Sequence, residues 1–396
     1  MYDFEKPLSF HIELTDKCNA RCVQCSRNFI DNDGKLKERP ELCLTEISLE
    51  QYKNIFKNYQ NKSKGVNFCG NMGDPVFAKD IFEISEYTLS NVINDYYLTG
   101  AKRSYGAFKV YTNGGMRSKK WWLEYGKLLK DKKAIVNFAI DGLEDTHHIY
   151  RTNTRYHRVI ENARAFMEGG GKAEWSFIRF GHNQHQEEEA RRLAKEYGFE
   201  QFTAVNTQRF YGREEMKYKW QNKDYSIKRY KPETYNLPEL GADKLDRTRK
   251  KWAGKSVNDL TADEINVNTQ KSLDKFVKNR DNATRDSKGT IDCHVQRRND
   301  VFIDCMGYVH PCCWIGSYEY HKINGLLPRH SNNRIDNELL DYRDYKKAWE
   351  VDFKDILKED WYEYIMPASW DVKPCMICAR QCGKGKFTTI RQSNRV

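Results

Sequence analysis

The 396-residue sequence lacks long apolar runs, internal repeats and low-complexity tracts. No window of about 18 uncharged apolar residues occurs, so a membrane span is not expected. The opening residues, MYDFEKPLSF, carry acids and no apolar core, which argues against a secretory signal. We therefore expect a soluble cytoplasmic protein without a membrane partner, long enough to bury a large core without disulfides.

Charged residues make up 31% of the chain and hydrophobic residues 39%, a balance typical of a globular protein. The formal net charge is +11. Such an excess can attract an anionic partner, whether nucleic acid, a phosphorylated substrate or an acidic peptide. The alternative is a solvated, lysine-rich surface. Composition leaves both interpretations open.

Twelve cysteines in a cytosolic chain call for a role other than disulfides. Ten of them form three groups, at positions 18–25, 293–313 and 375–382, and only Cys43 and Cys69 lie apart. Clustering of this kind favours metal ligation.

The first half of the chain alternates short apolar runs with amphipathic stretches. The runs predict six strands, each rich in β-branched or aromatic residues: 9–14, 65–69, 108–111, 135–140, 174–180 and 202–205. The stretches between them predict helices: 48–59, 79–97, 118–130, 158–167 and 186–197. This alternation indicates a parallel sheet with right-handed crossovers. Six such units predict an α/β fold, a partial (βα)6 TIM-like barrel with reactive residues at the C-terminal strand ends.

The pattern changes after residue 212. Residues 213–290 hold 19 Lys/Arg against 13 Asp/Glu, and we interpret them as a basic connector or insertion with a helix at 260–277. Residues 291–396 hold seven of the twelve cysteines and predict a small α+β cluster-binding domain. The predicted domains are thus a barrel over 1–212, a connector over 213–290 and a C-terminal domain over 291–396.

Cys18, Cys22 and Cys25 form a C-x3-C-x2-C motif in the loop after the first predicted strand. Three closely spaced thiolates can hold three irons of a [4Fe–4S] cluster and leave the fourth iron open to a substrate. An open coordination site separates a catalytic metal centre from a structural one. The alternative, a zinc knuckle, needs a fourth ligand nearby. His11 lies within the strand, and the loop holds no second cysteine pair.

This motif resembles the cluster motif of the radical S-adenosylmethionine (SAM) superfamily. The resemblance implies that the amino and carboxylate groups of SAM bind the open iron. It implies further that an electron from the cluster breaks a carbon–sulfur bond, giving methionine and a 5′-deoxyadenosyl radical that takes a hydrogen atom from a second substrate. An electron donor such as flavodoxin or ferredoxin is implied as well. By this resemblance Cys18, Cys22 and Cys25 are the catalytic residues that bind the cluster.

Two further turns resemble SAM-binding turns of the same superfamily. The CGNMGDPV stretch after the second predicted strand is similar to its Gly-Gly-Glu-Pro loop. By that match Asn71, Gly73 and Asp74 line the methionyl end of SAM, with Asp74 in the place of the glutamate. The YTNGG stretch is similar to the family's Thr-Asn-Gly turn and adds Asn113 as a cofactor-binding residue.

The fourth predicted strand ends in FAIDGLEDTHHIYR. This stretch is similar to the Ser-x-Asp-Gly…Arg pattern of the subgroup that includes the anaerobic sulfatase-maturing enzymes. In that subgroup the aspartate approaches the SAM ribose and the arginine pairs with the SAM carboxylate. Asp141 and Arg151 occupy these places, and Ala139 stands where the serine would be. A guanidinium suits a carboxylate because the geometries of the two groups match.

The C-terminal cysteines resemble the C-x(9–15)-G-x4-C element of the SPASM and twitch extensions of radical SAM enzymes. Residues 302–309 predict a hairpin, which would bring Cys293 and Cys312 together at one end. The single-cluster twitch form fits better than a full SPASM domain because the C-x2-C-x5-C-x3-C run is absent.

The resemblance implies one auxiliary [4Fe–4S] cluster, whose ligands we assign as Cys293, Cys312, Cys375 and Cys378. Cys382 competes for the last place, whereas Cys305 and Cys313 are surplus. The alternative is a structural zinc site of the four-cysteine type, which has similar spacing.

Together these resemblances imply an oxidoreductase or isomerase-type enzyme that oxidises, cross-links or rearranges a peptide or amino-acyl group. Members of the family that modify peptides often carry an N-terminal leader-binding domain. Because the first predicted strand begins near residue 9, we expect no such domain here, which weakens the peptide interpretation, although a separate protein could do that job. The segments YSIKRYK and RTRKKW interleave aromatics with cations and favour an alternative, a substrate linked to DNA or RNA. A third alternative is a non-catalytic iron–sulfur electron carrier or a zinc-bound nucleic-acid module. The SAM-binding turns count against it.

Overall fold

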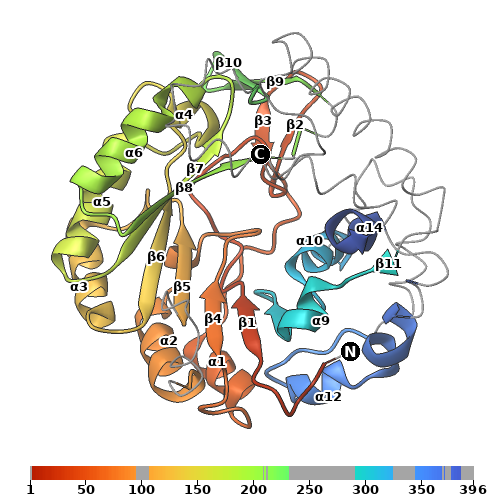
Figure 1. Cartoon of the computed structure of the whole chain (residues 1–396). Coiled ribbons are helices and arrows are strands. Elements are labelled where there is room, and N and C mark those ends of the chain that lie inside the picture. The colour runs from red at the N-terminus through yellow and green to blue at the C-terminus, as the bar shows by residue number, and fades with distance from the viewer. Residues whose placement is uncertain are drawn as a thin grey trace, which may run out of the picture.

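The computed structural model describes residues 2–94, 107–207, 209–210, 213–231, 290–323, 344–367, 370 and 376–384 (Figure 1). Its main feature is an eight-stranded sheet in the order β13-β12-β1-β4-β5-β6-β7-β8. Six of these strands are β1 (Ser9–Ile12), β4 (Gly65–Phe68), β5 (Phe108–Thr112), β6 (Ala134–Ala139), β7 (Ala173–Arg179) and β8 (Gln201–Asn206). Each pairs in parallel with the next. They coincide with the six predicted strands, so the predicted α/β partial barrel is confirmed.

The helices between these strands cover the outer face of the curved sheet (Figure 1). They are α1 (Leu49–Phe56), α2 (Ile81–Tyr87), the π-helical turn η2 (Thr88–Val92), α3 (Lys119–Leu129), α5 (Tyr156–Glu168) and α6 (Glu187–Glu196). Ser48 and Gln51 form a reciprocal capping box at the start of α1, and the hydroxyl of Ser118 caps α3. Helices α3 and α5 lie so close that a Cβ on Gly126 would stand 2.0 Å from the carbonyl oxygen of Phe166.

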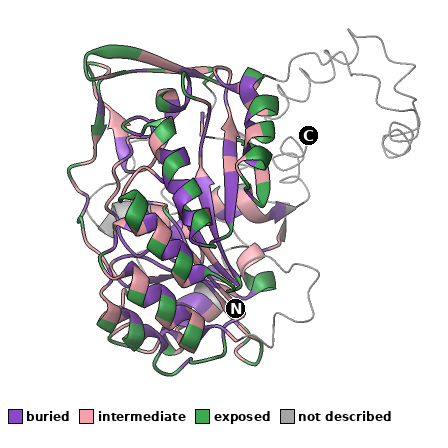
Figure 2. Cartoon of the chain, turned by 90° about the vertical axis from the view of Figure 1, so that its left-hand side faces the viewer, coloured by how far each residue is buried: buried purple, intermediate pink, exposed green. Residues whose placement is uncertain are grey.

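The core lies between the sheet and these helices, because every second residue of a strand points to the same face. In Figure 2 the strands are buried, whereas the outer sides of the helices are exposed. Fully buried core residues of the central strands are Phe108, Val110, Val136, Phe138, Trp175 and Phe177. The residues between them face the inside of the barrel.

The edge of the barrel next to β1 is closed by a strand from far along the chain. Strand β12 (Asp300–Ile303) pairs in parallel with β1, and β13 (Val309–His310) pairs antiparallel with β12. The predicted hairpin over residues 302–309 is thus confirmed. Its place in the main sheet was not predicted, because a four-residue strand carries no local sign of which distant strand it will join.

Two antiparallel hairpins lie side by side at the end of the sheet where the parallel strands finish (Figure 1). One consists of β2 (Asn28–Ile30) and β3 (Leu36–Glu38), the other of β9 (Glu215–Trp220) and β10 (Lys223–Lys228). The backbone N–H of Lys219 donates to the carbonyl of Gly34 over 2.7 Å and joins the two hairpins. Neither hairpin was predicted from the sequence.

Short elements make up the described C-terminal part. They are β11 (Thr290–Ile291), α9 (His294–Arg298), α10 (Cys313–Ile323), α12 (Phe353–Leu357), α14 (Met376–Cys382) and β14 (Gly383–Lys384). The helix predicted over 260–277 lies outside the described residues. Within the part that the structure describes, none of the helices is both long and apolar enough to span a membrane.

Candidate functional site

The loop after β1 carries Cys18, Cys22 and Cys25, and each thiol contacts a different neighbouring turn. The Cys18 sulfur accepts a hydrogen bond from Asn113 Nδ2 over 3.6 Å. The Cys22 sulfur accepts one from Arg151 Nη1 over 3.7 Å, and the Cys25 thiol donates to the carbonyl of Asn71 over 3.9 Å. The three partners follow β5, β6 and β4. The C-terminal ends of four parallel strands thus meet at the three predicted cluster ligands.

The surroundings of these thiols suit a positively charged ligand. Burial raises the pKa of the Cys22 thiol to about 11, although the guanidinium of Arg151 acts in the opposite direction. Burial and the carboxylate of Asp74 also raise the pKa of Cys18 well above its usual range. A bound metal takes the place of the thiol proton and supplies the positive charge that a buried thiolate needs.

Two glycines of the loop after β4 are needed for backbone packing. A Cβ on Gly73 would lie 1.9 Å from the carbonyl oxygen of Thr15, and one on Gly70 would lie 2.2 Å from that of Gly73. The loop thus packs directly on the start of the cysteine loop. Glycine is required at both positions because an added Cβ would collide with protein backbone.

Glu13 follows directly after β1 and binds the backbone of the same loop. Its buried carboxyl group accepts hydrogen bonds from the backbone N–H groups of Met72 and Gly73. Burial raises the pKa of Glu13 to about 8, although these two N–H groups act in the opposite direction. Sequence reasoning missed this residue, because a glutamate in a strand carries no local sign of a partner some sixty positions away.

The pKa of Glu13 predicts a pH-dependent stability. In the unfolded chain the carboxyl group takes its ordinary pKa of 4.5, so between pH 4.5 and about 8 only the folded protein holds this proton. The stability linked to Glu13 is fully present below pH 4.5 and is lost as the pH rises towards 8, at about 1.4 kcal/mol per pH unit. In urea unfolding at pH 5 and pH 8, a Glu13→Gln variant should lose less stability than the wild type. A Glu168→Gln control on the exposed side of α5 should follow the wild type, and equal slopes for all three proteins would contradict the assignment.

Asp74 is buried, and its carboxylate accepts hydrogen bonds mainly from the end of β5 and the turn that follows. It accepts hydrogen bonds from the Thr112 hydroxyl at 2.9 Å, the Asn113 N–H at 2.7 Å and the Asn113 side-chain amide at 2.6 Å. The N–H of Val76 donates to it as well, over 3.2 Å. Asp74 therefore fixes the position of Asn113, whose amide also reaches the sulfur of Cys18.

Asp141 and Arg151, predicted to contact the ribose and the carboxylate of SAM, form a buried ion pair with each other. Arg151 Nε lies 2.6 Å from Asp141 Oδ2, and the side chain of Asp141 is 0% exposed. The other carboxylate oxygen of Asp141 accepts the N–H of Ile178 over 2.5 Å. One guanidinium thus joins a carboxylate on one side to the sulfur of Cys22 on the other.

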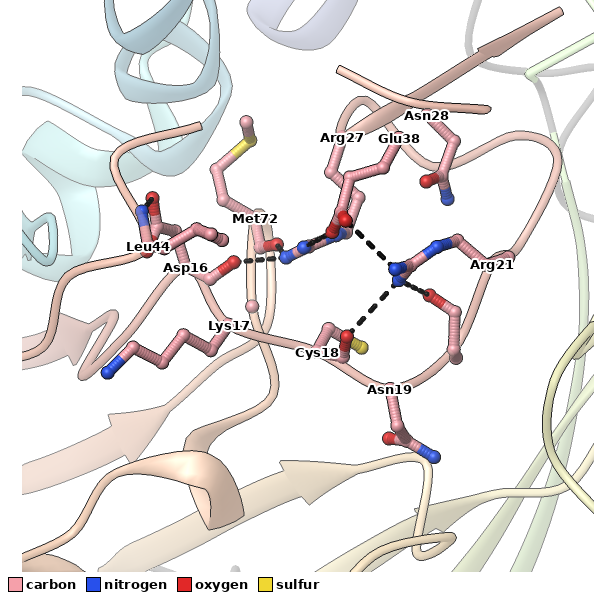
Figure 3. Close-up of polar contacts among 12 residues, drawn as sticks. Asp16, Lys17, Cys18, Asn19, Arg21, Arg27, Asn28, Glu38, Leu44 and Met72 are labelled. Atoms are coloured by element: carbon pink, nitrogen blue, oxygen red, sulfur yellow. Dashed lines mark hydrogen bonds and ion pairs between the residues drawn. The ribbon is translucent and has the colours of Figure 1, made fainter. Parts of the chain in front are cut away.

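A second buried arginine fixes the cysteine loop from the opposite side (Figure 3). Arg27 donates to the carbonyls of Asp16 and Met72 and to the carboxylate of Glu38. The same carboxylate accepts a hydrogen bond from Arg21 over 2.8 Å. These contacts bind β3, the loop before Cys18 and the loop after β4 into one unit. The partners of these arginines are distant in sequence, so no sequence motif predicted the contacts.

The second group of cysteines is brought together in part. Burial and a hydrogen bond to Cys382 raise the pKa of Cys293, the hydrogen bond having the larger effect. Burial chiefly raises the pKa of Cys312, and Cys313 and Cys382 add smaller effects in the same direction. Cys378 is buried in the main apolar core. Cys375, the fourth assigned ligand, lies outside the described residues.

Next to Cys312, His310 lies in a fully buried group of charged side chains. Its Nε2 is 2.7 Å from Asp304 Oδ2, and its Nδ1 contacts the carboxylate of Glu319. Burial lowers the pKa of His310, but the carboxylates of Glu319 and Asp304 outweigh burial and raise it. This group fixes the corner between β13 and α10 that carries Cys312.

Among the described residues, no three His, Cys, Asp or Glu side chains converge as a single metal ion requires. A [4Fe–4S] cluster does not require such convergence, because each cysteine binds a different iron. Three thiols on one loop, two of them beside N–H donors, fit the cluster. The described fold and site therefore define an α/β partial barrel with a cluster-binding loop at the C-terminal end of its first strand.

The comparison with protein families identifies this class. Residues 12–199, just under half of the chain, match the model of the radical SAM superfamily, and this part of the chain is a radical SAM domain. The match spans the three cysteines and all six predicted SAM-binding residues. No curated protein matches the sequence.

Solved structures of similar shape include two radical SAM proteins. The Streptococcus suis protein SuiB bound to S-adenosylmethionine has 15% sequence identity and a TM-score of 0.46, over 92% of this chain and 68% of that one. The protein anSMEcpe, with bound AdoMet and the Kp18Cys peptide, has 12% identity and a TM-score of 0.46, over 98% of this chain and 95% of that one.

Proposed function

We propose that this chain is a radical SAM oxidoreductase or isomerase-type enzyme. It binds a [4Fe–4S] cluster through Cys18, Cys22 and Cys25, cleaves SAM reductively and acts on a peptide or amino-acyl substrate. The observation that carries the proposal is the meeting of these thiols with Asn71, Asn113 and Arg151. Those partners come from the three turns that the SAM-binding motifs mark.

The chain's own residues bind and orient the reactants. When bound, the cluster and SAM together supply the electron that breaks a carbon–sulfur bond and the 5′-deoxyadenosyl radical that abstracts hydrogen. Asn71 and Gly73 lie in the loop that would receive the methionyl end of SAM, and Asp74 positions Asn113 beside Cys18. Arg151 donates a hydrogen bond to the sulfur of Cys22, and its pairing with Asp141 keeps it there.

The inner face of the barrel supports a substrate rich in hydrogen-bonding groups. TIM barrels normally fill this space with branched apolar side chains. Here Lys109 pairs with Glu174, Asn137 donates to Glu174 over 3.2 Å, and Ser176 donates to Asn137 over 2.7 Å. Tyr111, two residues before Asn113 on β5, is 39% exposed. A peptide or amino-acyl group offers the amide donors and acceptors that such a surface can bind.

The alternative of a substrate linked to DNA or RNA rests on two basic segments, of which the structure describes the first, residues 225–231. Tyr225 stacks on Tyr218 with ring centroids 5.3 Å apart, and the guanidinium of Arg179 lies over the ring of Tyr230. One face of each ring is thus covered within the protein, while Tyr225 also lines a hollow of about 500 Å³ and Tyr230 is half-buried. The second basic segment, 247–252, lies outside the described residues.

We also propose one auxiliary [4Fe–4S] cluster at the C-terminal cysteines. The hydrogen bond between Cys293 and Cys382 supports it and keeps Cys382 beside Cys378 as a candidate ligand. Cys375 remains the proposed fourth ligand. The iron contents of Cys378→Ala and Cys382→Ala variants decide between these two residues, because the variant that lacks a ligand loses the auxiliary cluster's iron.

The test of the function is SAM cleavage without a second substrate. The protein is reconstituted with iron and sulfide in the absence of oxygen, dithionite and SAM are added, and 5′-deoxyadenosine is quantified. The wild type should form it, and Cys22→Ala should form none, because a [4Fe–4S] cluster needs each of its thiolate ligands. Cys43→Ala, an exposed cysteine outside the motif, is the matched control. Equal product from wild type and Cys22→Ala, or none from any of the proteins, would refute the proposal.

A further inference from the structure

Arg27 is the only buried lysine or arginine in the part of the chain that the structure describes. Its side chain is 2% exposed, and it lies two positions after Cys25 in the sequence. A buried cation is costly unless it is paired and hydrogen-bonded. Water and salt screen the exposed cations of the chain, but they screen a buried charge much less. Arg27 therefore acts on its neighbours more strongly than an exposed cation does.

The contacts of Arg27 place its charge at the base of the cysteine loop (Figure 3). The guanidinium donates to the carbonyl of Asp16, two positions before Cys18. It also donates to the carbonyl of Met72 over 2.6 Å, in the loop that accepts the thiol of Cys25. Two residues of chain span at most about 7 Å, so the guanidinium lies within about 10 Å of the backbone of Cys18.

The carboxylate that pairs with Arg27 is shared with a second arginine. Glu38 accepts hydrogen bonds from Arg27 and, over 2.8 Å, from Arg21, whose guanidinium also donates to the carbonyl of Cys18 over 3.3 Å. Arg21, Arg27 and Glu38 are here named the arginine–glutamate group. Two cations share one anion, so the group keeps one net positive charge. The side chain of Glu38 is 28% exposed, so water screens this anion more than it screens Arg27.

The charges on the other side of the thiols do not replace this cation. Asp141 and Arg151 form a pair at 2.6 Å, so their charges largely cancel. Asp74 adds a buried carboxylate beside Asn113, which disfavours a further negative charge. The reduction of a cluster on this loop adds one negative charge. Accommodating that charge therefore depends on the arginine–glutamate group.

Arg27 also has a donor that its described neighbours leave unused. Its Nε is buried and has no hydrogen-bond acceptor among the residues that the structure describes. An unpaired N–H in a protein interior is costly and calls for an explanation. Sulfides and thiolates of an iron–sulfur cluster are acceptors, and hydrogen bonds to them are among the factors that set its reduction potential. Both the charge and the spare donor of Arg27 thus suit a reduced cluster.

We infer that Arg27 raises the reduction potential of the cluster on Cys18, Cys22 and Cys25, and that Glu38 offsets part of this effect. The inference rests on the proposed function. In the step concerned, one electron passes from a one-electron donor to the cluster, and no bond forms or breaks. One charge about 10 Å away, at an effective dielectric constant of about 20, changes the ratio of reduced to oxidised cluster roughly tenfold.

The test is a redox titration followed by EPR spectroscopy, which does not depend on SAM cleavage. Wild type and variants are reconstituted with iron and sulfide, and dithionite sets the potential. The signal of Cys22→Ala, which lacks a ligand of the first cluster, is subtracted to remove the auxiliary cluster. At the potential that reduces half of the wild-type cluster, Arg27→Met should show a ratio of reduced to oxidised cluster about tenfold lower. Glu38→Gln should show a ratio at least threefold higher.

Opposite shifts in these two variants separate charge from mere support of the loop. Arg27→Lys keeps the charge and should lie closer to the wild type than Arg27→Met does. Arg192→Met, which removes an exposed cation on α6, is the matched control and should stay within twofold of the wild type.

Two results would overturn the inference. One is an unchanged potential in both Arg27→Met and Glu38→Gln, and the other is a shift of both in the same direction. If Arg27→Met fails to hold iron, Glu38→Gln and Arg27→Lys still decide. A wild type that forms no [4Fe–4S] cluster at all refutes the proposed function and the inference with it. A loaded wild type whose potential ignores these substitutions refutes the inference alone.

Discussion

An Arg151→Met variant is expected to lose about 3–5 kcal/mol of its free energy of unfolding. Stability is lost because the carboxylate of Asp141 remains buried without its partner. Asp141 is 0% exposed, and without the guanidinium 2.6 Å away it keeps only the N–H of Ile178. The same variant should lose more than 100-fold in SAM cleavage, because the cation beside Cys22 is gone. Urea unfolding and 5′-deoxyadenosine formation measure the two effects separately.

A double variant, Asp141→Asn/Arg151→Met, separates structure from function. Neutralising Asp141 removes the unpaired charge, so part of the stability should return. SAM cleavage should not return, because Arg151 is proposed to act on the cofactor as well as on Asp141. Recovery of both would show that Arg151 serves only to hold Asp141. Arg192→Met, which breaks exposed ion pairs with Glu189 and Glu196, should change stability far less.

A Gly73→Ala variant should be destabilised by about 3 kcal/mol and should lose SAM binding. The added Cβ would stand 1.9 Å from the Thr15 carbonyl oxygen and 2.8 Å from Asp16 Cα. Both are backbone atoms at the start of the cysteine loop, so neither can rotate away. The loop after β4 must move instead, and with it Asn71 and Asp74. Urea unfolding and calorimetric titration with SAM measure the two losses.

Gly34→Ala is the matched comparison, because it isolates the cost of backbone conformation. Gly34 has φ +78°, and nothing lies within 4 Å of an added Cβ. Its replacement should therefore cost only about 1–2 kcal/mol for the left-handed conformation and should leave SAM binding intact. If the two alanine variants behave alike, the loop after β4 shifts freely and the steric argument fails.

The sequence predicted those parts of the fold that have a local signal. The six parallel strands were predicted because short β-branched and aromatic runs alternate with amphipathic stretches. The helices predicted from residues 48 and 118 begin there because the side-chain oxygens of Ser48 and Ser118 cap them. The cysteine loop was predicted from spacing alone, and the family comparison supports it.

The parts that could not be predicted depend on partners far along the chain. In the sequence, Glu13 looks like an ordinary strand residue and Arg27 like an ordinary loop residue. In the structure both are buried and both bind the loop around Met72. Likewise, nothing near Asp74 in sequence shows that Thr112 and Asn113 will take up its carboxylate. Long-range hydrogen bonds of this kind leave no periodicity and no motif.

The pairing of β12 with β1 has a consequence for the order in which the protein is made. Strand β1 leaves the ribosome among the first residues, but its neighbour on one side, β12, follows about 290 positions later. At 5–20 residues per second, this edge of the sheet waits roughly 15–60 s for its partner. Until then the strand that leads into Cys18 has an open hydrogen-bonding edge, which can pair with another chain. Iron loading of the newly made protein is therefore best timed after synthesis of the C-terminal part, when the barrel edge is closed.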